Sequence, residues 1–286
     1  MKVLINIIKF ISITILAICM ISLGILTIVS STILNEEYII SKLEETNFYD
    51  GTYELVKSNF EKSIYQSGLE EEVLNDICTE KKLKEDINTI ISNLYRGTNK
   101  KIDTTEISEK LNENIEKSGV KRTSKNSKAI DEFVKHICDE YTDTLIHTKY
   151  ESKINSNYKE IVNIINKGYN IISIALVVDI IILIAINNKK VSKDLQGIGI
   201  ALFSTGTFEL IVANIITSKV NIAGIKIFND VFSKTIVTII QEIISKIISL
   251  GVGTIIIAMI FIAIYAIIAA LKANKTTKKH NKEEMQ

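Results

Sequence analysis

Four long runs rich in Ile, Leu, Val and Ala constrain this chain more than any other feature of its sequence. Crossing the hydrocarbon core of a bilayer takes about 20 helical residues, and residues 10–34, 168–186, 195–217 and 250–271 are long enough. Backbone groups in lipid must be hydrogen-bonded within their own segment, and the runs lack the alternation of barrel strands. The sequence therefore predicts an all-α membrane protein with four transmembrane helices.

The first run also begins like a secretory signal peptide. Lys2 and Lys9 precede it, and the small residues of Val29-Ser30-Ser31 are typical of a cleavage site. The run is, however, about twice as long as the apolar core of a signal peptide. We therefore expect an uncleaved anchor, with cleavage before Thr32 as the alternative.

Lysines near the four runs predict the orientation of the chain. If every run crosses, residues 1–9, 187–194 and 272–286 lie on one side with ten lysines, against four lysines in residues 218–249 on the other side. The ten are Lys2, Lys9, Lys189, Lys190, Lys193, Lys272, Lys275, Lys278, Lys279 and Lys282, and the four are Lys219, Lys226, Lys234 and Lys246. Short cytoplasmic loops are enriched in Lys and Arg, whereas long translocated domains are exempt from the rule. We expect a multi-pass plasma-membrane protein with both termini cytoplasmic and residues 36–166 outside.

Residues 35–167, between the first two runs, are expected to form a helical extracytoplasmic domain. Residues 36–166 contain 19 Lys and Arg against 26 Asp and Glu, and a segment of this length can bury its own core. Apolar residues recur at helical spacing, also over 69–78, and Thr105 is placed to cap a helix. Glycines stand where helices would stop, in Asp50-Gly51, Ser67-Gly68, Arg96-Gly97 and Ser118-Gly119. We predict about five helices, with loops at 98–103 and 121–128.

A polar stripe within residues 129–150 has the spacing of a metal site. His136, Glu140, Asp143 and His147 follow one another at intervals of four, three and four residues, and two His with two carboxylates suit zinc. The alternative is a solvated polar face. We favour it, because the stripe lies opposite the apolar face of the predicted helix, where no cavity would dehydrate a metal ion. We expect no cofactor.

Cys78 and Cys138 lie at the margins of the apolar faces of their predicted helices. In an oxidising compartment a disulfide between them would close a loop of about 60 residues and stabilise the domain by about 2–4 kcal/mol. Two unpaired thiols packed as small core side chains fit the pattern as well. Both interpretations stay open at this point.

Two acidic residues, Asp179 and Glu209, lie inside the predicted spans. A charge at the centre of a membrane helix costs about 2.5–3.5 kcal/mol, so each should face other helices, have a partner or be protonated. At about 1.5 Å of rise per residue, Ser204, Thr205 and Tyr265 lie level with Asp179 and are its expected donors. Glu209 lies roughly 9 Å further out by the same rise, so the two acids should not pair. They act either as hydrogen-bonded contacts in a packed bundle or as steps in a proton or solute path.

Residues 218–249 carry an amphipathic pattern. Their apolar face comprises Ile225, Phe228, Phe232, Ile236, Ile239 and Ile243. A helix with such a face lies in the headgroup plane or packs under the outward domain. We expect the second arrangement, with a bend at Gly251 and Gly253 on entry to the fourth span.

Composition and motifs narrow the function. With 34 Lys and Arg against 33 Asp and Glu, the chain lacks the basic surplus of a nucleic-acid-binding protein. It contains no HExxH, GxSxG, GxGxxG or Walker motif. We expect a non-enzymatic integral membrane protein of the cell envelope, acting as scaffold, sensor or partner subunit for another membrane or surface protein. The alternative is a transporter or permease subunit with a polar path past Asp179 and Glu209.

Overall fold

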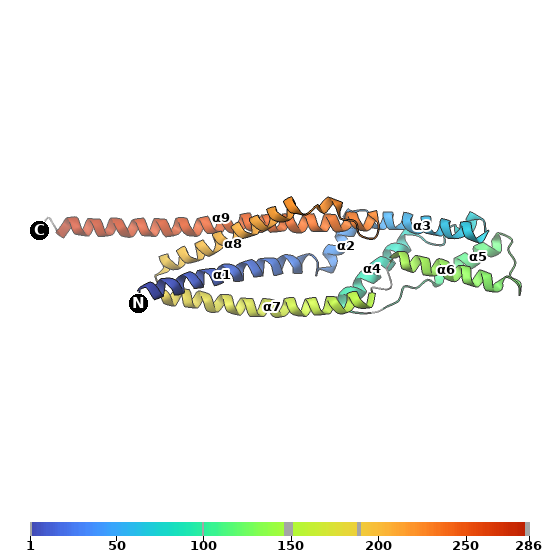
Figure 1. Cartoon of the computed structure of the whole chain (residues 1–286), viewed down its shortest axis with the longest axis horizontal. Coiled ribbons are helices and arrows are strands. Elements are labelled where there is room, and N and C mark those ends of the chain that lie inside the picture. Colours follow the sequence, from blue (N-terminus) through green and yellow to red (C-terminus); the bar gives the residue numbers. More distant parts are fainter. Residues whose placement is uncertain (1, 99, 146–150, 188–189, 284–286) are drawn as a thin grey trace. The chain divides into compact units, whose positions relative to one another are not determined.

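The computed structural model describes residues 2–98, 100–145, 151–187 and 190–283, and every regular element in these ranges is a helix (Figure 1). Four of the helices are long and apolar enough to cross a membrane. They are α1 (Lys2–Ser31), α7 (Glu151–Ile186), α8 (Val191–Lys219) and α9 (Asp230–Glu283). The prediction of an all-α protein with four membrane-spanning helices is thus confirmed.

These helices are longer than the apolar runs that predicted them. The fourth run and the amphipathic segment before it form one helix, α9, of 54 residues. The predicted amphipathic helix begins later than expected, because α8 continues to Lys219 and only a short 3-10 helix, η3 (Ile222–Gly224), precedes Asp230. The Asn229 side chain accepts a hydrogen bond of 2.9 Å from the Phe232 N–H and so caps the start of α9.

The packing of the chain divides it into two units. One, here called the spanning unit, comprises Met1–Thr32, Asn163–Ile225 and Ile239–Gln286. The other, here called the helical domain, comprises Ile33–Val162 and Lys226–Thr238. The divisions fall inside α7 and α9, so each of these two helices contributes residues to both units.

The helical domain is built around one apolar core. Its elements are α2 (Glu36–Glu45), α3 (Phe48–Ser67), η1 (Glu71–Leu74), α4 (Glu80–Arg96), α5 (Thr105–Lys117), α6 (Ser127–Leu145) and the first residues of α9. The apolar face predicted for α6 is buried, comprising Ile130, Val134, Ile137, Tyr141 and Leu145. It packs with Val56 and Phe60 of α3 and with Leu111 of α5 in the same core. Helical periodicity therefore identified the core-facing residues of α6 correctly.

The short segment 226–238 completes this core. Phe232 packs edge-on against Phe48 with ring centroids 4.9 Å apart, and the Thr46 and Thr235 hydroxyls are 2.8 Å apart. A Cβ at Gly51 would lie 2.8 Å from the Val231 side chain, so the absence of a side chain there permits the close approach of α9 to α3. Residues 226–238 of the predicted amphipathic segment thus pack within the domain, whereas its remaining residues belong to the spanning unit.

The predicted helix ends are right in three places and wrong in one. Gly68, Gly97 and Gly119 follow helices and have positive φ angles of 73°, 65° and 86°, as the left-handed helix-terminating position requires. Gly51, in contrast, lies inside α3, and the chain turns before it at Asn47, whose φ is 54°. Asparagine tolerates this conformation better than most residues. The helical spacing over 69–78 is also misleading, since only η1 is regular there.

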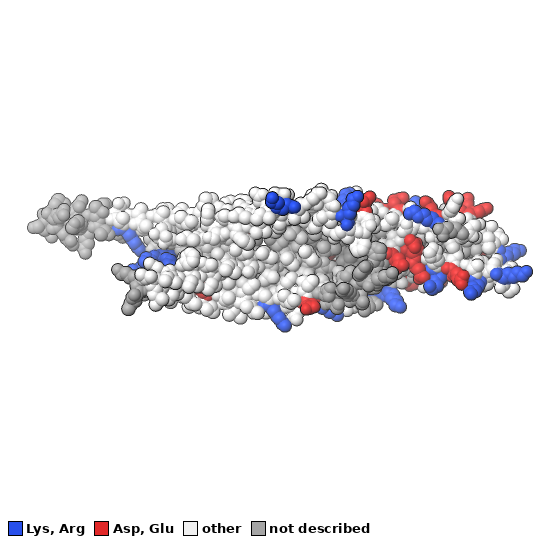
Figure 2. Space-filling view, in the orientation of Figure 1, with Lys and Arg blue, Asp and Glu red and all other residues white. Residues whose placement is uncertain are grey.

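Charge and exposure differ between the two sets of helices. Figure 2 shows Lys, Arg, Asp and Glu side chains gathered over α3 to α6, whereas the visible surfaces of α1, α7, α8 and α9 are largely uncharged. Large apolar side chains are exposed along α7, including Ile171, Ile174, Val177 and Ile181. An apolar outer surface of this extent suits hydrocarbon rather than water.

Candidate functional site

The two acidic residues predicted to lie inside the spans, Asp179 and Glu209, are both buried, with 4% of each residue exposed. Asp179 comes from α7 and Glu209 from α8. Neither faces the apolar outer surface, as the cost of placing a charged group in hydrocarbon requires. They are the candidate functional groups of the membrane-spanning helices.

Asp179 contacts α1 rather than the helices expected from the sequence. The Ser12 hydroxyl donates a hydrogen bond of 2.8 Å to Asp179 Oδ1, and neither Ser204 nor Tyr265 is its partner. Thr205 is buried but uses its hydroxyl for the carbonyl oxygens of Ala201, at 2.9 Å, and Ala17, at 3.3 Å. The predicted donors are therefore wrong, because α1 lies against α7 at the level of Asp179.

Glu209 lies where α8, α9 and α1 meet. The Thr254 hydroxyl of α9 donates to Glu209 Oε2 at 3.3 Å. On the side of α1, a Cβ at Gly24 would lie 3.0 Å from Glu209 Oε1 and 2.7 Å from the Leu250 side chain. Gly24 thus leaves the space that the carboxyl group of Glu209 occupies.

Side-chain hydrogen bonds join neighbouring helices of the spanning unit in the order α7, α1, α8 and α9. Ser12 with Asp179 joins α1 to α7, Thr205 with the Ala17 carbonyl joins α8 to α1, and Thr254 with Glu209 joins α9 to α8. Figure 1 shows the four helices in the same order. Asp179 and Glu209 belong to different helix pairs, which agrees with the expectation that they do not form a pair.

A close approach of backbones accompanies these bonds. A Cβ at Gly206 of α8 would lie 2.5 Å from the Gly251 carbonyl oxygen of α9, and a Cβ at Gly251 would lie 3.0 Å from the Gly206 carbonyl oxygen. Gly251 thus serves helix packing, and α9 continues through it and through Gly253 without interruption. This contact was not predicted from the sequence, although small residues on separate spans are the usual signal of close packing between membrane helices.

Three residues of the predicted polar stripe, His136, Glu140 and Asp143, lie on α6 in the described part of the chain. No group of three His, Cys, Asp or Glu side chains there could hold a metal ion. His136 Nε2 lies 3.3 Å from the Ser63 hydroxyl of α3, while Glu140 and Asp143 follow on the same helix. His147 lies outside the described residues.

The three cysteines are free thiols, and the Cys78–Cys138 disulfide is not formed. The Cys78 thiol donates weakly to the neighbouring Thr79 carbonyl at 3.7 Å, and the Cys138 thiol to the Thr104 carbonyl at 3.9 Å. Burial raises the pKa of Cys78 to about 11 and also raises that of Cys138. Since the thiolate is the reactive form, the raised pKa values lower the reactivity of both thiols at neutral pH.

A polar network inside the helical domain was not expected from the sequence. The Lys82 ammonium group lies 2.7 and 2.6 Å from the two carboxylate oxygens of Asp86 and donates to the Asp103 carbonyl at 3.1 Å. The Tyr141 hydroxyl donates to Asp86 Oδ2 at 2.7 Å, and burial raises the pKa of Tyr141 well above its ordinary value. The network ties α4 to α6 and to the loop before α5. Its sequence signal is the Lys-to-Asp spacing of four residues, which is also common on solvated helix faces.

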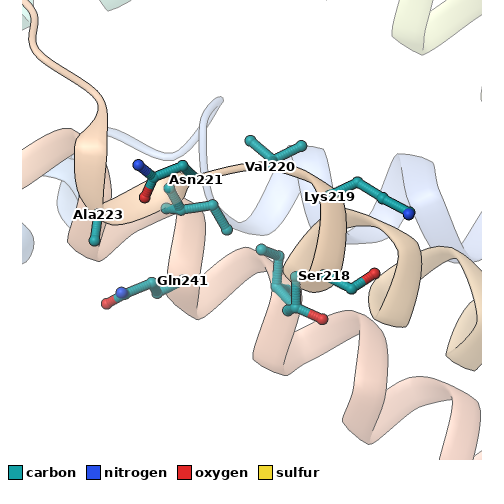
Figure 3. A pocket seen from close by; sticks show the side chains of 9 residues that line it. Ser218, Lys219, Val220, Asn221, Ala223 and Gln241 are labelled. Carbon is teal, nitrogen blue, oxygen red and sulfur yellow. The ribbon is translucent and has the colours of Figure 1, made fainter.

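A pocket of about 520 Å³ lies at the end of α8, lined by residues 217–223 with Gln241 and Ile244 of α9 (Figure 3). Its polar side chains do not converge, since Lys219 points away from Asn221 and Gln241 in Figure 3. The Asn221 side chain already accepts a hydrogen bond from the Gly224 N–H at 3.1 Å. A binding site for a small molecule needs several polar groups directed at one point, so we assign no ligand to this pocket.

Comparisons with models of protein families, with curated proteins and with solved structures found no match for this chain. The function is therefore argued from its own residues.

Proposed function

We propose that this protein is a non-enzymatic partner subunit or scaffold of the cell envelope, anchored in the plasma membrane, whose helical domain faces outward and binds another protein. The observation that carries the proposal is that residues 33–162 and 226–238 form one unit with a continuous core. A domain with a complete core of its own, presented by membrane-spanning helices, is suited to recognition at the membrane surface.

The same observation supports the proposed topology. The chain between α1 and α7 and the chain between α8 and α9 pack together through Phe48 and Phe232, so both connections lie on one side of the membrane. Four crossing helices require this arrangement, with the two termini and the α7–α8 loop on the other side. The lysine asymmetry then favours the cytoplasm for the termini and the outside for the domain.

The surface of the domain favours a polar partner with a small apolar anchor. Among the side chains that the structure describes in the helical domain, few large apolar ones are exposed, and Tyr65 of α3 is the most exposed of them at 91%. Tyrosine is enriched among the residues that dominate binding energy at interfaces. The acidic surplus of residues 36–166 favours a partner with a basic surface. We therefore place the partner contact at the end of α3 that carries Tyr65.

The topology is tested by labelling intact cells with a membrane-impermeant maleimide. A Tyr65→Cys variant should be labelled, whereas a cysteine appended after Gln286 should react only after the membrane is opened. The native chain is the control for the background from its own thiols, of which Cys19 and Cys78 are buried. Labelling of the C-terminal cysteine from outside would overturn the proposed orientation.

The partner is tested with a photo-crosslinking residue at position 65 and a matched one at Lys81, an exposed position on α4. Position 65 should give one defined product with a second protein, weakened by salt, and position 81 should not. No product at position 65 would overturn the proposed contact. Recovery of a stoichiometric ATPase would favour the transporter alternative, which we do not propose because Asp179 and Glu209 belong to different helix pairs.

A further inference from the structure

Asp179 has one carboxyl oxygen with a partner and one without. Ser12 donates to Oδ1 at 2.8 Å, whereas Oδ2 is buried and has no hydrogen-bond partner in the described structure. Only 4% of Asp179 and 3% of Ser12 are exposed. Buried polar atoms in folded proteins nearly always have a partner, so an ionised Asp179 would carry a buried charge that the surrounding side chains only half satisfy.

The surroundings of this carboxyl group are apolar. The neighbouring parts of α1, α7 and α8 form a cluster that includes Leu16, Leu183 and Ala201. The titratable group facing Asp179 from α1 is the buried thiol of Cys19. None of the Lys and Arg side chains described in the structure forms an ion pair with Asp179. Lys9, Lys193 and Asp194 interact with one another instead.

The chemistry of Oδ2 excludes most ligands. A partner helix cannot reach an atom that is buried within this chain. A metal cation needs several oxygen ligands, and the site offers the carboxyl group and one hydroxyl, which is already donating its hydrogen. A proton needs no additional space and removes the charge, and burying a neutral polar group costs far less than burying an unpaired charge.

We propose that Asp179 and Ser12 form a proton-binding site in the spanning unit, with the proton on Oδ2 and with Oδ1 accepting the hydrogen bond from Ser12. The step is the transfer of one proton from hydronium to the carboxylate: an O–H bond of hydronium breaks, the Oδ2–H bond forms, and a water molecule is released. The neutral acid joins α7 to α1, and its deprotonation leaves a charged group with a single donor in an apolar cluster. The proposal is independent of the partner of the helical domain.

Infrared spectroscopy of the purified chain in lipid vesicles at neutral pH tests this site. The native protein should show the carbonyl band of a protonated carboxylic acid, and ¹³C at the aspartate side-chain carboxyl should shift that band without any substitution. Asp179→Asn should remove the aspartic acid band. Ser12→Ala should retain it at higher frequency, because the carbonyl oxygen loses its donor.

Glu209→Gln and Asp194→Asn are the matched controls, since each removes another buried acid of the spanning unit and should leave the Asp179 band in place. An isotope-labelled native protein without such a band would overturn the proposal, and so would a band that survives in Asp179→Asn. A band that appears only when sodium is omitted would assign the site to a metal cation and overturn it as well. If Asp179→Asn does not fold, the labelled native protein and Ser12→Ala still decide the question.

Discussion

In the helical domain, helices turn apolar faces inward and charged faces outward, whereas in the spanning unit the outer surface is largely apolar and the carboxyl groups of Asp179 and Glu209 are buried. Burial of apolar surface is the main force that holds the domain together. Between helices surrounded by lipid that force is absent, and close packing of small residues and hydrogen bonds replace it. A carboxyl group therefore has a different role in each unit.

Asp86 and Asp179 make this difference concrete. Asp86 lies in the domain core, paired with a lysine and a tyrosine that satisfy both of its oxygens. Asp179 lies in the spanning unit with one donor, Ser12. Removing one partner of a buried ion pair strongly destabilises the fold, because the other charge stays buried without a counter-charge. The largest expected effect therefore lies in the domain.

Asp86→Ala should destabilise the helical domain by about 3–5 kcal/mol, because it leaves the Tyr141 hydroxyl without its acceptor and the Lys82 ammonium group without its counter-charge, with only the Asp103 carbonyl as acceptor. Asp139→Ala is the matched control, since Lys135 and Asp139 have the same spacing on an exposed face and such pairs contribute less than about 1 kcal/mol. Eight of the ten tyrosines lie in residues 33–162, so tyrosine fluorescence during urea unfolding measures the domain. Equal effects of the two variants would contradict the structural role of the network.

This network also shows where sequence-based prediction ends. The buried face of α6 and the helix ends at Gly68, Gly97 and Gly119 were predictable, because periodicity and left-handed glycines are local signals. Lys82 and Asp86 have the spacing of a solvated pair, and only the packing of α6 against α4 brings Tyr141 to them. Contacts between distant segments leave no mark on local periodicity.

The same limit explains the incorrect donors of Asp179. Helix α1 begins at Lys2, eight residues before the apolar run that predicted it, so Ser12 lies deep enough in the helix to reach Asp179. A depth estimate based on residues 10–34 places Ser12 at the end of the span instead. Gly51 was misassigned for a related reason, because its role is the approach of Val231 from a segment about 180 residues away.

Gly206→Ala should destabilise the spanning unit by about 1–3 kcal/mol, as overpacking does. Its Cβ would meet the Gly251 carbonyl oxygen at 2.5 Å, and backbone atoms of two helices cannot yield as a flexible side chain does. Gly253→Ala is the control, because a Cβ there has no neighbour within 4 Å. Unfolding in mixed micelles of increasing SDS content, followed by circular dichroism, measures both variants. An equal loss of stability in Gly253→Ala would contradict the packing role of Gly206, because Ala favours a helix over Gly and its Cβ would meet no neighbour at position 253.

Raising the pH above about 9 should destabilise the helical domain. Burial raises the pKa of Cys78 from 9.0 to about 11, so its thiol is neutral in both states below pH 9. Between pH 9 and 11 the thiol ionises first in the unfolded chain, and stability falls as the pH rises. The expected contribution is on the order of 1 kcal/mol. Cys78→Ala should make the fall of the urea midpoint between these pH values smaller, because Cys138 and Tyr141 still contribute to it, and an unchanged slope would show that Cys78 does not contribute to the loss.

Thr254→Val should have the smallest effect, about 0.6 kcal/mol, the average for a hydrogen bond between membrane helices. The substitution removes the donor to Glu209 at 3.3 Å and keeps the shape of the side chain. Thr207→Val is the matched control, because the Thr207 hydroxyl bonds to the Phe203 carbonyl of its own helix. SDS unfolding should separate Thr254→Val from this control by a small margin, well below the loss in Gly206→Ala. If Thr254→Val were instead as harmful as Gly206→Ala, the hydrogen bond to Glu209, and not the approach of the two glycines, would hold α8 to α9.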